Sequence, residues 1–206
     1  MEDSDVVEQD VLKACAGDTD SLTRLFSKFT PQLERMVRLR LDPKLRARVS
    51  AEDILQQAYC EALKRLPEYC LDQSMPFYLW LRFLAAQELI NARRHHLGVQ
   101  KRSVEAEVSL NRGALPQVDT ASLARQLVGK ITSPTQAALR SEVQLAIQRA
   151  LNEMEPIDRE IIVLRHFEHM SNNEVAQLLD LQKATASKRY VVALKRLQTF
   201  MADTDQ

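Results

Sequence analysis

Residues 170–197 have the sequence MSNNEVAQLLDLQKATASKRYVVALKRL, which predicts a short helix, a tight turn and a longer basic helix. Ser171 and Glu174 stand three residues apart and can form a capping box, so the first helix should begin at Asn172. A turn at 180–182 then leads into the second helix. This order of elements is typical of the helix-turn-helix, which places its second helix in the major groove of DNA.

The second of these helices should have an apolar face and a basic face. The residues expected to pack inward recur at helical spacing and are Ala186, Tyr190, Ala193, Leu194 and Leu197. The opposite face offers Ser187, Lys188, Val191 and Lys195. Residues 183–196 include basic side chains and no acidic one, although the whole chain has no net charge at pH 7. This pattern favours a DNA-reading helix over the alternative, a solvated basic face on an ordinary core helix.

The composition favours an all-α protein. The 206 residues are 45% hydrophobic and include only four glycines, which leaves little room for β-turns or phosphate-binding loops. Most apolar residues recur at spacings of three and four, as in amphipathic helices. The N-terminus is acidic and polar, and no apolar run approaches membrane length. We therefore expect a cytoplasmic protein without a signal peptide or membrane insertion.

The three cysteines, Cys15, Cys60 and Cys70, are odd in number and lack the spacing of metal ligands. In a cytoplasmic protein such residues are expected to be reduced thiols. The sequence therefore predicts neither a disulfide nor a metal site from its cysteines.

An enzyme is another class of function to consider, and the sequence gives it little support. His95 and His96 are adjacent and cannot share one helical face, while His166 and His169 have no third ligand nearby. The chain has no glycine-rich phosphate loop, nucleophile elbow or acidic cluster with metal-ligand spacing. We expect no catalytic residues, no metal, no cofactor and no small-molecule substrate.

Charge is segregated along the chain. Residues 24–48 hold eight Arg or Lys against Glu34 and Asp42, and residues 93–102 form a second basic cluster. The segment 153–180 is acidic by contrast. Such segregation suits a protein that contacts phosphate with some faces and another protein with others.

The spacing of apolar residues predicts a helical domain over residues 15–97. Its first helix should start near Asp18 and end at Pro43, with Pro31 interrupting or restarting it. The next helix should begin at Ser50 and stop at Pro67. Residues 67–76 should then form a loop, and an apolar helix should run from Phe77 to Arg94.

Residues 98–133 differ in character, because glycine and proline stand there among polar residues without sustained periodicity. This predicts a flexible linker with a short helix near 121–128. A second helical domain should span 134–203. The sequence SPTQ at 133–136 should start a helix that ends near Glu153, and residues 157–167 should form one more helix before the helix-turn-helix.

Motifs in both predicted domains are similar to those of one known family. In the first domain, SAEDILQQAY at 50–59 resembles a DAEDLVQE-x-F helix, and Phe77, Trp80 and Leu81 with RRHH at 93–96 resemble the F-x-x-W-L…R-R segment that follows it. In the second domain, DRE at 158–160, LR at 164–165, Ser171, EVA at 174–176 and the segment 185–197 match a region that reads the −35 promoter element. By these motifs the chain is identified as a member of the extracytoplasmic-function (ECF) group of sigma-70 factors, the dissociable promoter-specificity subunits of bacterial RNA polymerase.

The resemblance implies an all-α fold with a sigma region 2-like bundle at 15–97, a linker at 98–133 and a sigma region 4-like helix-turn-helix domain at 134–203. It implies a factor that binds core RNA polymerase, recognises −35 and −10 promoter DNA and helps to open the duplex. It also implies regulation by an anti-sigma factor that clamps the two domains, for which the long polar linker would act as a hinge.

The resemblance places the −35 contacts on the second domain. The residues implied are Arg165, Thr185, Ser187, Lys188, Val191, Val192 and Lys195. Lys188 can donate to guanine, a valine can contact a thymine methyl group, and Thr185 can bind phosphate at the helix N-terminus. Arg189 is expected to bind phosphate or another part of the protein. Asp180 stands where glycine is common in the family, and aspartate tolerates the left-handed conformation of such a turn.

The resemblance places −10 recognition and melting around the loop 67–76 and the following helix. An unstacked base needs aromatic or apolar walls. The residues implied are Tyr69, Phe77 and Tyr78 for stacking and Arg82, Asn91, Arg93 and Arg94 for the backbone. Phe77 and Trp80 have a competing interpretation as core residues. Ala86 and Gln87 stand where the family often has Arg and Asn, so the −10 preference is expected to be unusual.

The capped helix that starts after Ser50 also has a polar row opposite its apolar face. The row consists of Asp53, Gln56, Gln57 and Glu61. By resemblance it binds the clamp coiled coil of the largest polymerase subunit, and the second domain docks on the flap tip of the other large subunit. The alternative is an ordinary solvated helix face.

The runner-up function is a helix-turn-helix transcriptional repressor that does not associate with polymerase. Such a protein would normally dimerise to read a palindrome. The sequence has no dimerisation heptad, and a repressor leaves the motif at 50–59 unexplained. Binding to core polymerase separates the two hypotheses.

Overall fold

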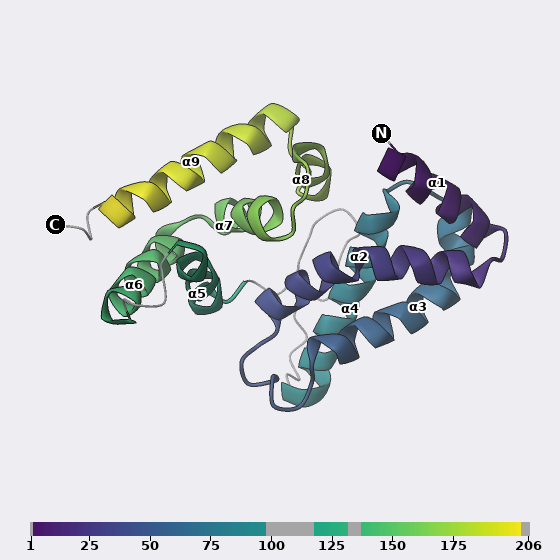
Figure 1. Cartoon of the computed structure of the whole chain (residues 1–206), viewed down its shortest axis with the longest axis horizontal. Helices are drawn as coiled ribbons and strands as arrows, with labels where there is room; N and C mark the ends of the chain where they lie inside the picture. The colour runs from purple at the N-terminus through teal and green to yellow at the C-terminus, as the bar shows by residue number, and fades with distance from the viewer. Residues whose placement is uncertain (1, 98–117, 132–136, 203–206) are drawn as a thin grey trace. The chain divides into compact units, whose positions relative to one another are not determined.

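The computed structural model describes residues 2–97, 118–131 and 137–202 (Figure 1). These residues form helices joined by short connections, with no β-strand among them, which confirms the all-α prediction. The chain divides into two compact units, Met1–Leu110 and Asn111–Gln206. None of the helices in the described ranges combines the length and the apolar character that crossing a bilayer would require.

The described part of the first unit contains four helices: α1 (Glu2–Cys15), α2 (Thr19–Arg40), α3 (Ala51–Leu71) and α4 (Phe77–Leu97). Helix α2 packs against each of the other three, and α3 packs against α4 (Figure 1). The largest fully buried side chains of the unit come mainly from α2 and α4 and include Leu22, Leu33, Met36, Leu81, Leu84 and Leu89.

Helix α2 starts as predicted, ends at Arg40 shortly before the predicted end at Pro43, and is not interrupted. Asp18 is its N-cap, and the carboxylate accepts a hydrogen bond from the N–H of Asp20 at 3.1 Å. Pro31 lies inside the helix without ending it, so the predicted interruption is wrong. Proline in a helix interior costs about 3 kcal/mol. Residues on both sides of Pro31, including Leu25 and Leu33, are buried, and each contributes roughly 1.5–3 kcal/mol, which outweighs this cost.

Helix α3 begins with the predicted capping box. The Asp53 N–H donates to the Ser50 hydroxyl at 3.1 Å, and the Ser50 N–H donates to the Asp53 carboxylate at 2.8 Å. Pro67 does not stop the helix, which continues to Leu71, so the predicted loop 67–76 shrinks to residues 72–76. The extension places the ring of Tyr69 in the core, and this burial stabilises the additional helical turn.

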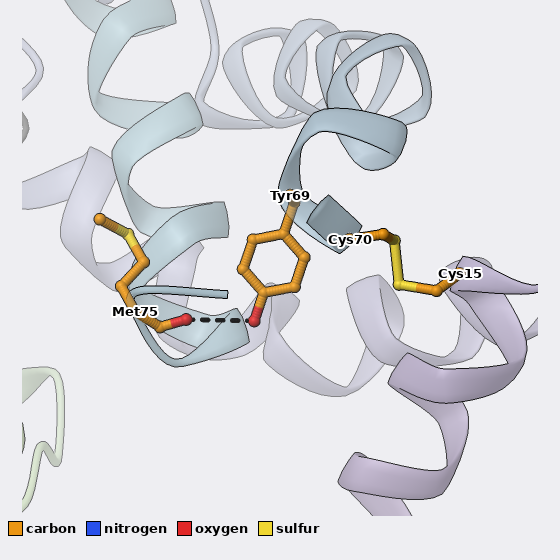
Figure 2. Close-up of a disulfide and its surroundings, with 4 residues drawn as sticks. All are labelled: Cys15, Tyr69, Cys70 and Met75. Atoms are coloured by element: carbon orange, nitrogen blue, oxygen red, sulfur yellow. Dashed lines mark hydrogen bonds between the residues drawn. A yellow bond between two sulfur atoms is a disulfide. The ribbon is translucent and has the colours of Figure 1, made fainter. Parts of the chain in front are cut away.

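Helix α1 was not expected from the sequence. The bond at its end corrects the prediction made for the cysteines. Cys15 at its end is bonded to Cys70 in the last turn of α3, with a Cα–Cα distance of 5.7 Å (Figure 2). The prediction of reduced thiols is therefore wrong for these two residues, because the fold brings them within the usual range of a disulfide. Cys60 is a free, exposed thiol.

An ion pair also joins α1 to α2. The Arg24 guanidinium donates to the Asp10 carboxylate at 2.9 Å, and Val11 and Ala14 are buried beside this pair. The hydrogen bond from Arg24 lowers the pKa of Asp10.

The described part of the second unit contains α5 (Thr120–Ile131), α6 (Ala137–Glu153), α7 (Pro156–Ile162), the π-helical turn η2 (Val163–Phe167), α8 (Asn172–Leu178) and α9 (Lys183–Ala202). The short helix expected near 121–128 is present and longer than predicted. The predicted cap at 133–136 and the linker residues 98–117 lie outside the described residues. Helices α5 and α6 pack together, and α9 packs against both α6 and α7.

The single helix expected at 157–167 is instead an α-helix that widens into a π turn. The N–H of Glu168 donates to the carbonyl of Val163 at 3.0 Å, and the N–H of Met170 donates to that of Leu164 at 2.9 Å. His169, between them, has a φ of 55°. This left-handed residue ends the turn and redirects the chain into α8.

An ion pair joins α9 to the start of α7. The Arg189 guanidinium donates to Asp158 at 2.8 Å and to Glu155 at 2.9 Å, and the side chain of Asp158 is only 7% exposed. The hydrogen bond that Arg189 donates to Asp158 raises the pKa of Arg189. Arg189 was expected to bind either phosphate or another part of the protein. The structure shows the second of these contacts.

Replacing Arg189 by alanine should destabilise the chain by about 2 kcal/mol, because the buried Asp158 carboxyl group would lose its guanidinium donor. Urea unfolding of the full chain measures this loss. The control is Arg196→Ala, which removes an exposed charge from the same helix and should change stability by less than about 0.5 kcal/mol. Equal effects of the two substitutions would contradict the assigned role.

The capping box of α3 predicts a pH dependence. The backbone N–H of Ser50 lowers the pKa of Asp53 below its ordinary value of about 4. The stabilisation from the ionised carboxylate is therefore complete above the unfolded pKa and is lost as the pH falls through the lower folded pKa. Asp53→Asn keeps an acceptor without the charge, so its stability should fall less than that of the wild type between about pH 5 and pH 2. Urea titrations across this range, compared between the two chains, test the prediction; parallel curves would refute it.

Candidate nucleic-acid interface

The helix-turn-helix has the predicted limits and caps. Helix α8 begins at Asn172, the Glu174 N–H donates to the Ser171 hydroxyl at 3.3 Å, and the Ser171 N–H donates to the Glu174 carboxylate at 2.7 Å. Asp180 in the turn has a φ of 53°, as expected for a residue that replaces glycine.

Two further hydrogen bonds fix α8 against α9. The N–H of Leu181 donates to the carbonyl of Ala176 at 2.8 Å across the turn. The side-chain amide of Asn172 donates to the carbonyl of Lys183, the first residue of α9, at 2.9 Å. Sequence reasoning assigned no role to Asn172, because a bond across eleven residues leaves no local pattern.

Helix α9 divides into a buried face and an exposed face. Ala186, Ala193 and Leu197 are buried, and Tyr190 and Leu194 are half-buried, as the spacing predicted. Six residues predicted to contact DNA are exposed on the remaining surface: Thr185, Ser187, Lys188, Val191, Val192 and Lys195. Val191 and Val192 are 50% and 39% exposed, a large fraction for apolar side chains. The exposed face therefore offers both ammonium donors and apolar contacts.

Arg165, the seventh predicted −35 residue, makes contacts within the unit. It is half-buried, its guanidinium donates to the carbonyl of Met170 at 3.0 Å, and it lies over the ring of Tyr190 at 5.3 Å from the centroid. These contacts link η2 to the start of α8 and to α9. A guanidinium has five N–H donors, so the Met170 bond leaves others for an additional partner.

The predicted −10 residues fall into two groups in the first unit. Tyr69, Phe77, Tyr78 and Arg82 are buried, each less than 7% exposed, so the prediction that they offer stacking and backbone contacts needs correction. Their burial follows from the longer α3, which brings Tyr69 onto the first turn of α4. Asn91, Arg93 and Arg94 are exposed on the last turns of α4.

An aromatic cluster explains the burial. The ring of Tyr69 lies 4.7 Å from Trp80 and 5.4 Å from Phe77, measured between centroids, and Phe77 and Trp80 are 5.3 Å apart. The Tyr69 hydroxyl donates to the carbonyl of Met75 at 3.1 Å, and burial raises the pKa of this tyrosine. Tyr78 packs on Phe29 at 5.3 Å. The core interpretation of Phe77 and Trp80 is therefore confirmed.

The two positions that depart from the family pattern differ in environment. Ala86 is buried, so it presents no surface to a ligand. Gln87 is half-buried, and its side-chain oxygen accepts a hydrogen bond from Arg65 at 3.0 Å.

The polar row of α3 lies on one exposed side of the helix. Asp53, Gln56 and Gln57 are exposed, whereas Glu61 is half-buried and pairs with Lys64 at 3.4 Å. The Asp53 carboxylate is already engaged in the capping box and Glu61 in an ion pair, which leaves the two glutamines as the members of the row that are best placed to bind a partner. In the described parts of the chain no group of three or more His, Cys, Asp or Glu is placed to hold a metal ion.

Comparison with known proteins gives consistent results. Residues 144–197 match the family model "Sigma-70, region 4", and this range runs from within α6 through α7, η2, α8 and the turn to most of α9. The RNA polymerase sigma-H factor of Pseudomonas aeruginosa is 26% identical over 140 residues, which span 68% of this chain and 66% of that protein. The ECF RNA polymerase sigma factor SigD of Mycobacterium tuberculosis is 26% identical over 188 residues, 91% of this chain and 80% of that protein.

A solved structure supports the fold. CnrH in complex with the cytosolic domain of CnrY superposes with a TM-score of 0.56 at 16% identity, covering 98% of this chain and 99% of that chain. At this identity the likeness concerns the fold alone. The similarity to SigD extends across both units, and the region 4 match coincides with the capped helix-turn-helix. The chain is similar to an ECF sigma factor over most of its length, and its helix-turn-helix matches region 4 of the sigma-70 family.

Proposed function

We propose that this protein is an alternative sigma factor that binds bacterial core RNA polymerase and directs it to promoters through −35 and −10 elements. The observation that carries the proposal is the exposed face of α9, which combines lysines with valines and is held outward by the ion pair of Arg189. Residues 15–97 of the first unit would serve as the region 2-like domain, and residues 134–203 of the second unit as the region 4-like domain. A repressor is disfavoured because the named relatives are sigma factors.

The −35 element would be read in the major groove. The Lys188 ammonium is on the exposed face of α9 and can donate to the guanine O6 and N7 acceptors, while Val191 and Val192 can contact thymine methyl groups. Thr185 in the first turn of α9 can donate to a phosphate, where the helix dipole also favours negative charge. Lys188 and the two valines would thus contact base edges, and Thr185 would contact the DNA backbone.

Arg165 would act at the edge of this surface. Its bond to the Met170 carbonyl and its position over Tyr190 fix the guanidinium plane. A fixed guanidinium loses little side-chain entropy on binding a phosphate oxygen, which suits a positioning contact more than base recognition.

The −10 element would be held at the last turns of α4. Asn91, Arg93 and Arg94 are exposed there and can bind the phosphates of a separated strand. The buried aromatic cluster gives this end of the unit its shape and is not proposed as a stacking platform.

Core polymerase would bind the polar row of α3. The two glutamines can each donate and accept hydrogen bonds across a protein interface, whereas the Asp53 carboxylate is committed to its own backbone. Because core polymerase works in the cytoplasm, we place this protein there. We also propose a regulatory partner of the anti-sigma type, by analogy with the complex of CnrH with the cytosolic domain of CnrY.

Lys188→Ala should weaken binding of an upstream-element duplex by about 1–3 kcal/mol and relax the preference at one base pair, because a guanine contact is lost. Fluorescence anisotropy on a set of single-base variants measures both effects. Arg196→Ala, which removes the same charge from the flank of α9, should leave the base preference unchanged. If Lys188→Ala instead gives a uniform loss that depends only on salt, the residue contacts phosphate.

Gln57→Arg should weaken association with core polymerase by about tenfold, which is ~1.4 kcal/mol, because a larger, charged side chain replaces an amide that is proposed to donate and accept hydrogen bonds at the interface. A labelled sigma chain titrated with core enzyme gives the dissociation constant. Gln9→Arg makes the same change at an exposed position of α1 and should have no effect. Failure of the unmodified chain to bind core enzyme at all would overturn the proposed function.

A further inference from the structure

The end of α3 is held by tertiary contacts in addition to its own helical hydrogen bonds. Pro67 has no N–H to donate within the helix, and Leu71 in the last turn is 91% exposed. After Pro67, the Asp72 N–H donates to the Glu68 carbonyl at 3.2 Å, and Cys70 is bonded to Cys15. Because Leu71 is exposed, it adds little burial energy, so the tertiary bonds help to stabilise this last turn.

The disulfide lies next to the anchor of the segment 72–76. Figure 2 shows Cys70 directed toward Cys15 and its neighbour Tyr69 directed toward Met75. The Tyr69 hydroxyl donates to the Met75 carbonyl at 3.1 Å, and its ring packs on Phe77 and Trp80 at the start of α4. One helical turn therefore connects the end of α1, the segment 72–76 and the first turn of α4.

The two cysteines of the disulfide are partly exposed. Cys15 and Cys70 are half-buried, each at the end of its helix. Helix α1 has a second fastening, the Asp10–Arg24 pair, which involves an arginine whose side chain is 53% exposed. Exposed ion pairs contribute little, so the disulfide is the stronger of the two constraints.

We propose that Cys15 and Cys70 form a reversible thiol–disulfide switch that sets the order of α1 and of the segment 72–76. A thiolate of the pair attacks a low-molecular-weight disulfide and releases one thiolate of that reagent. The other cysteine attacks the mixed disulfide and releases the second. Two protein thiols and one small disulfide become one protein disulfide and two small thiols, and the two electrons pass to the small disulfide. Excess small thiol reverses the reaction.

The consequence for function rests on the proposed sigma activity. In the oxidised chain the segment before α4 is tied to the turn that carries Cys70, and in the reduced chain this tie is lost. Because α4 carries the proposed −10 contacts, oxidation should favour strand capture by the first unit. Binding of duplex −35 DNA by α9 belongs to the other unit and should not respond.

The first experiment uses the full chain with Cys60→Ser, so that only the pair can react. The protein is treated with glutathione disulfide or with dithiothreitol, and blocked thiols are counted by mass after alkylation. Hydrogen exchange is then followed in both states. Reduction should speed the exchange of the last turn of α1 and of residues 68–76 by about tenfold or more, with α8 and α9 unchanged. Failure of glutathione disulfide to form the bond, or equal exchange in the two states, would overturn the switch.

The second experiment uses the same chain assembled with core polymerase. Oxidised holoenzyme should form open promoter complexes at least about threefold faster than reduced holoenzyme, and Cys15→Ser/Cys70→Ser should match the reduced form under both treatments. Equal rates in the two states would overturn the functional part of the switch. If neither state initiates transcription while exchange still responds to reduction, the sigma activity is wrong and the structural switch stands.

Discussion

Burial of one stripe of α9 determines what the second unit shows to solvent. Ala186 and Ala193 are small enough to let α9 lie close against its neighbours, and the Arg189 pair fixes its rotation about its own axis. A helix fixed in this way has no freedom to choose which side faces outward, so Lys188 and Val191 are exposed. The proposed DNA-reading surface is thus a consequence of packing on the opposite side, and the capped turn at Ser171 and Asp180 sets the approach of the chain to it.

Features that depend on neighbouring residues were predictable from the sequence. The capping boxes at Ser50 and Ser171 join residues three apart, and the left-handed Asp180 follows from its place in a two-helix turn. The buried positions of α9 follow from a period of 3.6 residues. The exposed members of the proposed DNA surface and of the polar row on α3 were predictable for the same reason, since the opposite side of an amphipathic helix is solvated.

Features that depend on distant residues were not predictable. Cys15 and Cys70 are 55 residues apart in sequence, and only the fold shows that the ends of α1 and α3 meet. Tyr69 was assigned to a loop because Pro67 was expected to stop the helix, whereas packing on Trp80 carries the helix past the proline. The aromatic residues were therefore predicted as a ligand surface when they form a core. The sequence left two roles for Arg189, phosphate binding and contact within the protein. The contact is with Asp158, which is 31 residues away and could not be identified from the local sequence.

Start-site selection by the reconstituted holoenzyme tests the account most directly. The chain is combined with bacterial core polymerase, and run-off transcripts are sequenced from a library of genomic fragments. The account predicts discrete start sites, absent with core enzyme alone, whose upstream DNA shares two elements at a fixed spacing. Transcripts that begin at the same positions with and without the chain would contradict it.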